Sequence, residues 1–408
     1  MADEVTAEQR RWCIAICVIA TFGCASSTPP PKTEKKPAVE TLHGVTITDP
    51  YRWLEDQNSP ETRAWIDREN AYTDKVLGDR PEKDLFSTRA GQLLKGDQLY
   101  LSVPRNGRIF YVRRAAGEEV FSLYMREGAH GPDHLLIDPA PWNPKHTTHV
   151  TFDDITSDGK LVVYDVREGG ADEVTPHFLD ADSGREVGLP LPLGLYFGVS
   201  VTPDHRTVYY SKELPEGTRL FRRSIDGGAE EKVFGDGYSP DKKVSFGISD
   251  DGRWLAAVVD NGAARVRREI FLKDLTAPDS PFKTVVDDLD VTTGIDFAGD
   301  TLVLTTLWNA PNVRIMTVSA ANPERANWRE IVPENKSLPI QAMTLAGGRI
   351  YVQYVENLKP RFVAYDLQGN KVDELTFDTL GTTDGLTGSW NSSQTYYTFS
   401  SFAVPPTI

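Results

Sequence analysis

The fold is decided by one stretch, Phe246-Gly247-Ile248-Ser249-Asp250-Asp251-Gly252-Arg253-Trp254-Leu255-Ala256-Ala257-Val258-Val259. Two largely apolar runs flank an Asp-Gly pair in this stretch. Asp251-Gly252 predicts a tight turn, because glycine adopts the positive φ that hairpin turns require. The stretch therefore predicts a β-hairpin.

The same pattern of strand, turn and strand recurs along the chain. Further copies turn at Asn106-Gly107, Asp158-Gly159, Asp204-His205, Gly299-Asp300, Gly347-Gly348 and Ser392-Ser393. Successive turns are 45–52 residues apart, and a repeat of this length built from strands indicates a β-propeller with one four-stranded sheet per blade. A β-sandwich with evenly spaced turns is the alternative, but the steady spacing favours a mainly β, seven-bladed β-propeller. The seventh blade is expected to be incomplete, because the chain stops at Ile408 inside it.

Composition excludes some classes of function. The 408 residues carry a formal net charge of -15, whereas a nucleic-acid-binding surface needs a basic face. All three cysteines (Cys13, Cys17 and Cys24) lie in the first 24 residues. The rest of the chain can therefore form neither disulfides nor thiolate metal sites.

Residues 1–24 resemble an export signal. Arg10-Arg11 precede an apolar run at residues 13–22, which is too short to span a bilayer. Gly23-Cys24 resembles the bacterial lipoprotein cleavage box, in which Cys24 would be lipidated, although Thr21 and Phe22 depart from that box. An ordinary cleaved signal or an uncleaved anchor is the alternative. We expect an exported protein of the bacterial periplasm or envelope that contacts the membrane only through a lipid anchor.

Three further segments follow the signal. Residues 25–38 are rich in proline and predict an extended tether. Residues 39–95 predict a short α-helical segment: Ser59-Pro60 is typical of a helix start, and we expect helices at about residues 60–77 and 81–94. Trp65, Tyr72 and Val76 mark a buried stripe on the first helix. Residues 96–408 contain the repeats and predict the propeller.

Two motifs resemble a known family, the prolyl oligopeptidases, which are serine peptidases. The first is His43-Gly44 followed by Asp49-Pro50-Tyr51-Arg52-Trp53-Leu54-Glu55-Asp56. The second is Tyr396-Tyr397-Thr398-Phe399-Ser400-Ser401-Phe402 with Pro405, which resembles a motif late in the propeller of that family. The resemblance covers residues 38–408.

The resemblance implies a seven-bladed propeller that caps an α/β-hydrolase domain, on which the N-terminal helical segment packs. The hydrolase domain carries the Ser/Asp/His triad, and the propeller gates entry so that short peptides are cut after proline. The sequence contains no Gly-x-Ser-x-Gly nucleophile motif, and Gly388-Ser389-Trp390 is the nearest fragment. No catalytic residue is therefore assigned, and the chain alone is expected to be inactive.

Other sites are weakly indicated. His130, His134, His146 and His149 are expected to be solvated loop residues rather than metal ligands, and Asp287, Asp288 and Asp290 lack the spacing of a calcium loop. Paired carboxylates at the centre of a propeller would suit a glycosidase, but turn carboxylates are the default. No metal or cofactor site is predicted.

Tyr196 and Phe197 are expected at the start of the innermost strand of blade three. They are candidates for lining the channel in the complete enzyme, and packing between blades is the alternative. Two functions remain open. The first is the propeller portion of an exported prolyl oligopeptidase-like peptidase whose hydrolase domain is missing from this chain and whose partners are short proline-containing peptides. The second is a non-catalytic envelope propeller that binds peptides or proteins.

Overall fold

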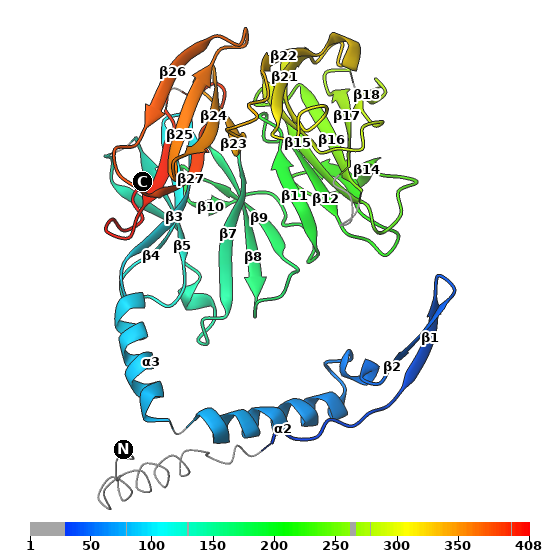
Figure 1. The fold of residues 1–408 in the computed structure, drawn as a ribbon, viewed down its shortest axis with the longest axis vertical. Helices are drawn as coiled ribbons and strands as arrows, with labels where there is room; N and C mark the ends of the chain where they lie inside the picture. The colour runs from blue at the N-terminus through cyan, green and yellow to red at the C-terminus, as the bar shows by residue number, and fades with distance from the viewer. Residues whose placement is uncertain (1–28, 79, 129, 262–266, 278, 393) are drawn as a thin grey trace, which may run out of the picture. The chain divides into compact units, whose positions relative to one another are not determined.

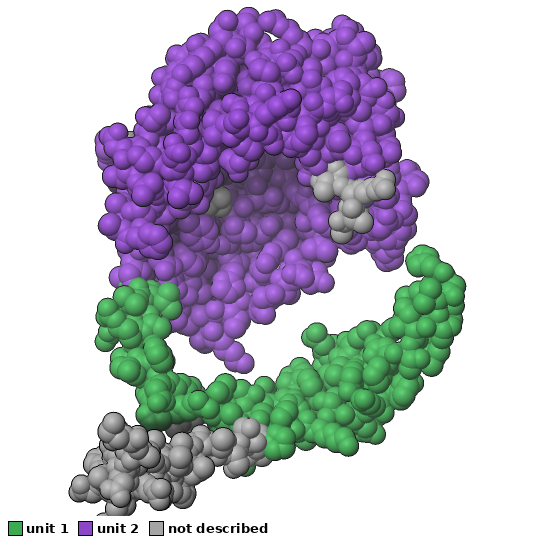
Figure 2. Space-filling model, viewed as in Figure 1, with its two compact units in different colours: residues 1–95 green, residues 96–408 purple. Residues whose placement is uncertain are grey.

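The computed structural model describes residues 29–78, 80–128, 130–261, 267–277, 279–392 and 394–408. The chain divides into two compact units, unit 1 (Met1–Lys95) and unit 2 (Gly96–Ile408), which have different colours in Figure 2. Unit 1 contains both α-helices of the described residues and unit 2 contains the repeated sheets.

Unit 1 is a hairpin followed by helices. Its elements are β1 (Ala38–Leu42), β2 (Val45–Asp49), the 3₁₀-helix η1 (Arg52–Leu54), α2 (Pro60–Leu77) and α3 (Pro81–Leu94). Both predicted α-helices are confirmed. The side chain of Ser59 accepts a hydrogen bond from the backbone N–H of Thr62 (3.1 Å), and Pro60 lacks an N–H where a helix has no internal acceptor for one. These two residues fix the start of α2.

Part of the segment expected as a tether is bound within unit 1. Trp65 Nε1 donates to Thr33 Oγ1 (3.0 Å), Trp53 Nε1 donates to the carbonyl oxygen of Glu34 (3.1 Å), and Lys36 pairs with Glu61. The stripe predicted on α2 from Trp65 onward is half-buried rather than buried. Residues 33–36 therefore lie against the start of the helical segment.

Unit 2 consists of sheets whose strands pair antiparallel in sequence order, from cyan β3 to red β27 in Figure 1. Blade one comprises β3 (Gln98–Arg105), β4 (Arg108–Arg114), β5 (Ser122–Glu127) and β6 (Asp133–Ile137). Blade two comprises β7 (Thr148–Ile155), β8 (Leu161–Glu168), β9 (Thr175–Asp180) and β10 (Arg185–Glu186). Blade three comprises β11 (Tyr196–Val201), β12 (Thr207–Lys212), β13 (Arg219–Ser224) and β14 (Glu231–Phe234).

The remaining blades repeat this order. Blade four comprises β15 (Lys243–Ile248), β16 (Trp254–Asp260), β17 (Arg268–Asp274) and β18 (Lys283–Val286). Blade five comprises β19 (Thr293–Ala298), β20 (Thr301–Thr306), β21 (Arg314–Ser319) and β22 (Arg329–Val332). Blade six comprises β23 (Ala342–Ala346), β24 (Arg349–Glu356), β25 (Lys359–Tyr365) and β26 (Lys371–Thr376). Short 3₁₀-helices, η2 (Ala140–Trp142) and η3 (Arg325–Asn327), lie between strands.

The number of blades differs from the predicted seven. The described residues form six four-stranded sheets, and the seventh repeat is a two-stranded sheet of β27 (Thr382–Thr387) and β28 (Tyr396–Ser400). After β28 the chain bends, with Ser401 N donating to the carbonyl oxygen of Val404 (2.9 Å), and it pairs again only at the bridge between Phe399 and Thr407. Both β27 and β28 contact β3, so this sheet closes the ring against blade one.

The core of unit 2 is divided among the gaps between neighbouring blades. One apolar cluster is shared by blades one and two, and four more join the successive pairs up to blades five and six. Val162 and Val163 are adjacent on β8 and fully buried, but they belong to different clusters. Side chains alternate between the two faces of a strand, so a strand packed on both sides is a continuous apolar run.

The turn in the opening stretch is a five-residue loop rather than a two-residue one. The same loop occurs in blades two, three and four. In blade four, Ser249 Oγ bonds to Asp251 Oδ1 and accepts from Trp254 N (2.9 Å). Thr156 with Asp158, and Thr202 with Asp204, make the same bonds in blades two and three. A hydroxyl two residues before an aspartate therefore closes each loop.

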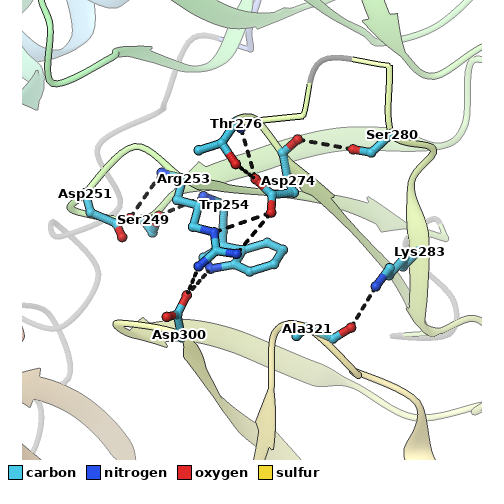
Figure 3. A network of polar contacts seen from close by, with 10 residues as sticks. All are labelled: Ser249, Asp251, Arg253, Trp254, Asp274, Thr276, Ser280, Lys283, Asp300 and Ala321. Atoms are coloured by element: carbon cyan, nitrogen blue, oxygen red, sulfur yellow. Dashed lines mark hydrogen bonds and ion pairs between the residues drawn. The ribbon is translucent and has the colours of Figure 1, made fainter.

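Polar contacts also tie neighbouring blades together (Figure 3). Asp300, in the first turn of blade five, accepts from Trp254 Nε1 (2.8 Å) and Arg253 Nη1 (2.9 Å) of blade four. The guanidinium of Arg253 lies over the indole ring of Trp254 and also pairs with Asp274. One carboxylate therefore holds a buried indole and a cation from the adjacent blade.

Candidate functional site

The first strands of the blades form the wall of a central channel. First strands of neighbouring blades contact one another from β7 to β11, β11 to β15, β19 to β23, β23 to β27 and β27 to β3. Such contacts require these strands to lie nearest the axis of the ring. Figure 2 shows a hollow in the middle of unit 2.

The channel wall is irregular on one side only. The first strands of four successive blades (β27, β3, β7 and β11) each carry a register shift against their second strands, whereas β15, β19 and β23 pair regularly with theirs. Such β-bulges re-aim side chains and are frequent beside functional sites. The residues in the bulges of β7 and β11 include Asp153, Phe197 and Gly198, and Gly198 has a φ of 121°.

Three aspartates cluster at the bulge of β7. Burial, together with the charges of Asp165 and Asp154, raises the pKa of Asp153 to about 8. Burial also raises the pKa of Asp165, on β8, to about 6. At pH 7 Asp153 is therefore mainly protonated, and a carboxylic acid that stays neutral can donate a hydrogen bond.

Asp154 is half-buried, and its carboxylate has hydrogen-bond partners. It accepts from Ser200 Oγ of blade three (2.6 Å) and from its neighbour Ile155 N (2.8 Å). Burial raises its pKa, and the hydrogen bond from Ser200 and the charge of Arg105 act in the opposite direction. By contrast, one oxygen of Asp165 is buried without a hydrogen-bond partner in the described part of the chain.

A pocket of about 250 Å³ lies where the first strands turn into the second strands. Its lining includes Arg105 at the end of β3, Asp250 in the first loop of blade four, Asp296 and Phe297 on β19, and Trp390. The side chain of Asp296 is exposed, and partial desolvation by the protein around it raises its pKa to about 6. Five positions from four blades thus place both signs of charge and two aromatic side chains around one space.

These arrangements supply charges and proton-holding groups but no nucleophile paired with a base. Within the described ranges no serine or threonine hydroxyl is hydrogen-bonded to a histidine: His177 bonds to Glu186, and His205 to Asp158. Among the residues with a described placement, no group of three or more His, Cys, Asp or Glu side chains is arranged so that it could hold a metal ion. The described part of the channel therefore offers charged and hydrogen-bonding groups.

The sequence placed Tyr196 and Phe197 at the start of the innermost strand of blade three, and both begin β11. Tyr196 packs on the core cluster shared by blades two and three, and its hydroxyl donates to the carbonyl oxygen of Pro192 (2.5 Å). The ammonium nitrogen of Lys243 in blade four lies 5.5 Å from the centroid of the Phe197 ring. Whether a peptide touches either residue stays a prediction.

Sequence reasoning missed the channel carboxylates and Arg105. It treated the aspartates as turn residues, yet Asp154 and Asp296 lie within strands. Aspartate is depleted in β-strands, so an aspartate inside an apolar run was an available signal. Arg105 carried no such signal.

The other predicted positions are distributed as follows. Cys24 lies outside the described residues. The four histidines singled out in the sequence form no cluster in the part of the chain that is described. Among the helices with described placement, none has the length and apolar character needed to cross a membrane.

Comparison with known proteins identifies the family. Residues 30–408 match the model of the prolyl oligopeptidase N-terminal β-propeller domain. The chain belongs to the prolyl oligopeptidase family. The resemblance read from the sequence motifs is thereby confirmed.

Curated relatives match most of the chain. It is 27% identical over 392 residues to a prolyl endopeptidase of Elizabethkingia miricola, which covers 93% of this chain and 55% of the relative. The dipeptidyl aminopeptidase BI of Pseudoxanthomonas mexicana is 24% identical over 360 residues, 80% of this chain and 48% of that protein. The chain therefore spans about half the length of the curated relatives that it matches.

Solved structures of prolyl oligopeptidases share the fold. A structure from a study of two prolyl endopeptidases and their inter-domain dynamics matches with a TM-score of 0.83 and 28% identity, over 92% of this chain and 57% of that one. Prolyl oligopeptidase B from Galerina marginata, bound to a 35-residue substrate, matches with a TM-score of 0.80 and 16% identity, over 93% and 57% of the two chains.

Proposed function

We propose that this chain is the propeller portion of a serine endopeptidase that cleaves short peptides after proline. The observation that carries the proposal is the 27% identity to a prolyl endopeptidase across 93% of the chain. The catalytic groups would come from an α/β-hydrolase domain, which corresponds to the part of the relatives that these 408 residues do not cover.

The proposed role of the propeller is to restrict which peptides reach that domain. The ring in unit 2 is held by apolar clusters between blades and by polar contacts such as those of Asp300. A ring braced in this way resists widening, so it would admit an extended peptide more readily than a folded protein. The bulged side of the channel would be the wall along which a peptide moves.

The test uses the native protein isolated from its source cells. A serine-directed phosphonate should label a species larger than 45.3 kDa, and this species should cleave a short fluorogenic peptide after proline. The same peptide sequence inserted in a surface loop of a folded protein should resist cleavage and become sensitive when that protein is unfolded.

Two outcomes would contradict parts of this proposal. An unlabelled, inactive species of about the mass of this chain would favour a propeller that binds peptides without catalysis. Equal cleavage of the folded and unfolded substrates would leave the peptidase assignment in place and remove the gating role. Export and lipid attachment at Cys24 also belong to the proposal.

A further inference from the structure

We name the pocket lined by Arg105, Asp250, Asp296, Phe297 and Trp390 the turn-end pocket. Some of its polar groups form no hydrogen bond with another described residue. Arg105 is held by two of its nitrogens: Nε donates to the carbonyl oxygen of Ile155 (3.1 Å), and Nη1 donates to that of Pro104 (3.0 Å). Its Nη2 donates no hydrogen bond to any residue that the structure describes. The guanidinium is therefore fixed in place with one donor group left over.

The carboxylates on the other side of the pocket are also unpaired. Neither Asp250 nor Asp296 forms a side-chain hydrogen bond or ion pair with another residue in the described ranges. The position of Asp250 is nevertheless fixed, because its backbone carbonyl accepts from Ser157 Oγ of blade two (2.9 Å). Asp296 lies in the regular strand β19. Both acceptors are thus presented on rigid backbone.

The carboxylates near Arg105 do not occupy its free donor group, so Arg105 can bind an anion. Asp154 affects Arg105 electrostatically, but its carboxylate is already bonded to Ser200 and Ile155 N. Burial raises the pKa of Asp250, and the charge of Arg105 lowers it. The pocket therefore has a cationic corner at Arg105 and an acidic side at Asp250 and Asp296.

The volume and the remaining walls favour a small ligand. At about 250 Å³, the space is smaller than the roughly 300–1,000 Å³ of sites for drug-sized ligands. Phe297 and Trp390 add apolar surface beside the charges. A small molecule with one anionic group, one cationic group and an apolar side chain matches these features.

We propose that the turn-end pocket binds a free amino acid or dipeptide, with its α-carboxylate on Arg105 and its α-ammonium on Asp296 and Asp250. The side chain of the ligand packs against Phe297 and Trp390. This is a non-catalytic site, and it does not depend on peptidase activity. It would let the propeller sense the small products that peptide hydrolysis releases.

The experiment is a calorimetric titration of the 408-residue protein with L-phenylalanine and with glycyl-L-phenylalanine. At least one of them should bind, and its N-acetyl and C-terminal amide derivatives, which each lack one charge, should bind at least about tenfold more weakly, as expected for the loss of a charge-assisted hydrogen bond. Absence of saturable binding by both ligands would overturn the proposal.

The variants assign each charge to its partner. Asp296→Asn should weaken binding of the unmodified ligand about tenfold and leave binding of the N-acetyl derivative unchanged. Arg105→Gln should likewise weaken binding of the unmodified ligand about tenfold and leave binding of the C-terminal amide unchanged. Arg105→Lys, which keeps the charge, should retain more affinity than Arg105→Gln, and the exposed-turn variant Asp226→Asn should bind like the parent. The assignment would be contradicted if Asp296→Asn and Arg105→Gln each weakened binding of the unmodified ligand, the N-acetyl derivative and the amide equally, with an unchanged melting temperature.

Discussion

Ser200 on β11 donates a hydrogen bond of 2.6 Å to the half-buried carboxylate of Asp154 on β7, and so joins blade three to blade two at the channel wall. Ser200→Ala should lower the free energy of unfolding by about 1–2 kcal/mol, because the half-buried carboxylate of Asp154 loses a charge-assisted hydrogen bond that water replaces only in part. Denaturation by urea at pH 7 measures the loss. Ser239→Ala, which removes an exposed bond to Asp241, is the control and should change stability by less than about 0.5 kcal/mol; equal losses would contradict the assignment.

Asp153 should make the protein less stable as the pH rises. Its pKa is about 8 in the folded protein and about 4 in an unfolded chain. Its contribution to stability is therefore full below about pH 4 and is lost as the pH rises toward 8. Asp153→Asn should exceed the parent in unfolding free energy by at least about 1 kcal/mol at pH 8 and match it near pH 4. A pH-independent difference between the two proteins would refute the shifted pKa.

Asp300 should be more sensitive to truncation than to neutralisation. Asp300→Ala leaves the buried indole N–H of Trp254 without its acceptor, which should cost about 1–3 kcal/mol. Asp300→Asn keeps an oxygen for that N–H and should lose less. Chemical denaturation of both variants, with Asp226→Ala as an exposed-turn control, separates the hydrogen bond from the charge. Equal losses in the two Asp300 variants would show that the charge on Arg253 dominates.

Two glycines in the first turns of blades four and five should respond differently to alanine. Both have positive φ, 73° at Gly252 and 62° at Gly299. A Cβ at Gly252 would lie 2.6 Å from Cδ of Pro203, whereas a Cβ at Gly299 meets nothing within 4 Å. Gly299→Ala should lose about 1–2 kcal/mol from backbone strain alone, and Gly252→Ala should lose more. Thermal unfolding ranks the pair, and a smaller loss at Gly252 would contradict the close approach.

Cys24 should carry the lipid if the export proposal is right. Growth of the source cells with radiolabelled palmitate should label the parent protein and place it in the membrane fraction. Cys24→Ser should abolish the label, because the thiol is the attachment point. Cys17→Ser should keep it. Labelling that survives in Cys24→Ser would rule out this lipoprotein site.

The repeat could be predicted because its signals are local. The opening stretch formed the hairpin of β15 and β16 as expected, and Ser59-Pro60 started α2. The loop closure could also have been foreseen, since Ser249 stands two residues before Asp251 just as Thr156 stands before Asp158. Interactions within a few residues leave such marks in a sequence.

The candidate site could not be predicted in the same way. The turn-end pocket joins Arg105 to Asp296 and Trp390, which are far apart in the chain. No periodicity reports which blades meet, and the bulge that presents Asp153 follows from pairing with a second strand. The fourth strand of blade two was equally hidden, because β10 has only two residues. Tertiary pairing, rather than local preference, decides these features.

The division of the core between neighbouring blades constrains how this protein can evolve. Deleting one blade would strip the partner surface from two apolar clusters at once, and inserting one would separate two surfaces that fit each other. Lineages should therefore keep the number of repeats while the outer loops gain and lose residues. Divergence among relatives would then concentrate in those loops, and the strands that share a cluster would change in concert.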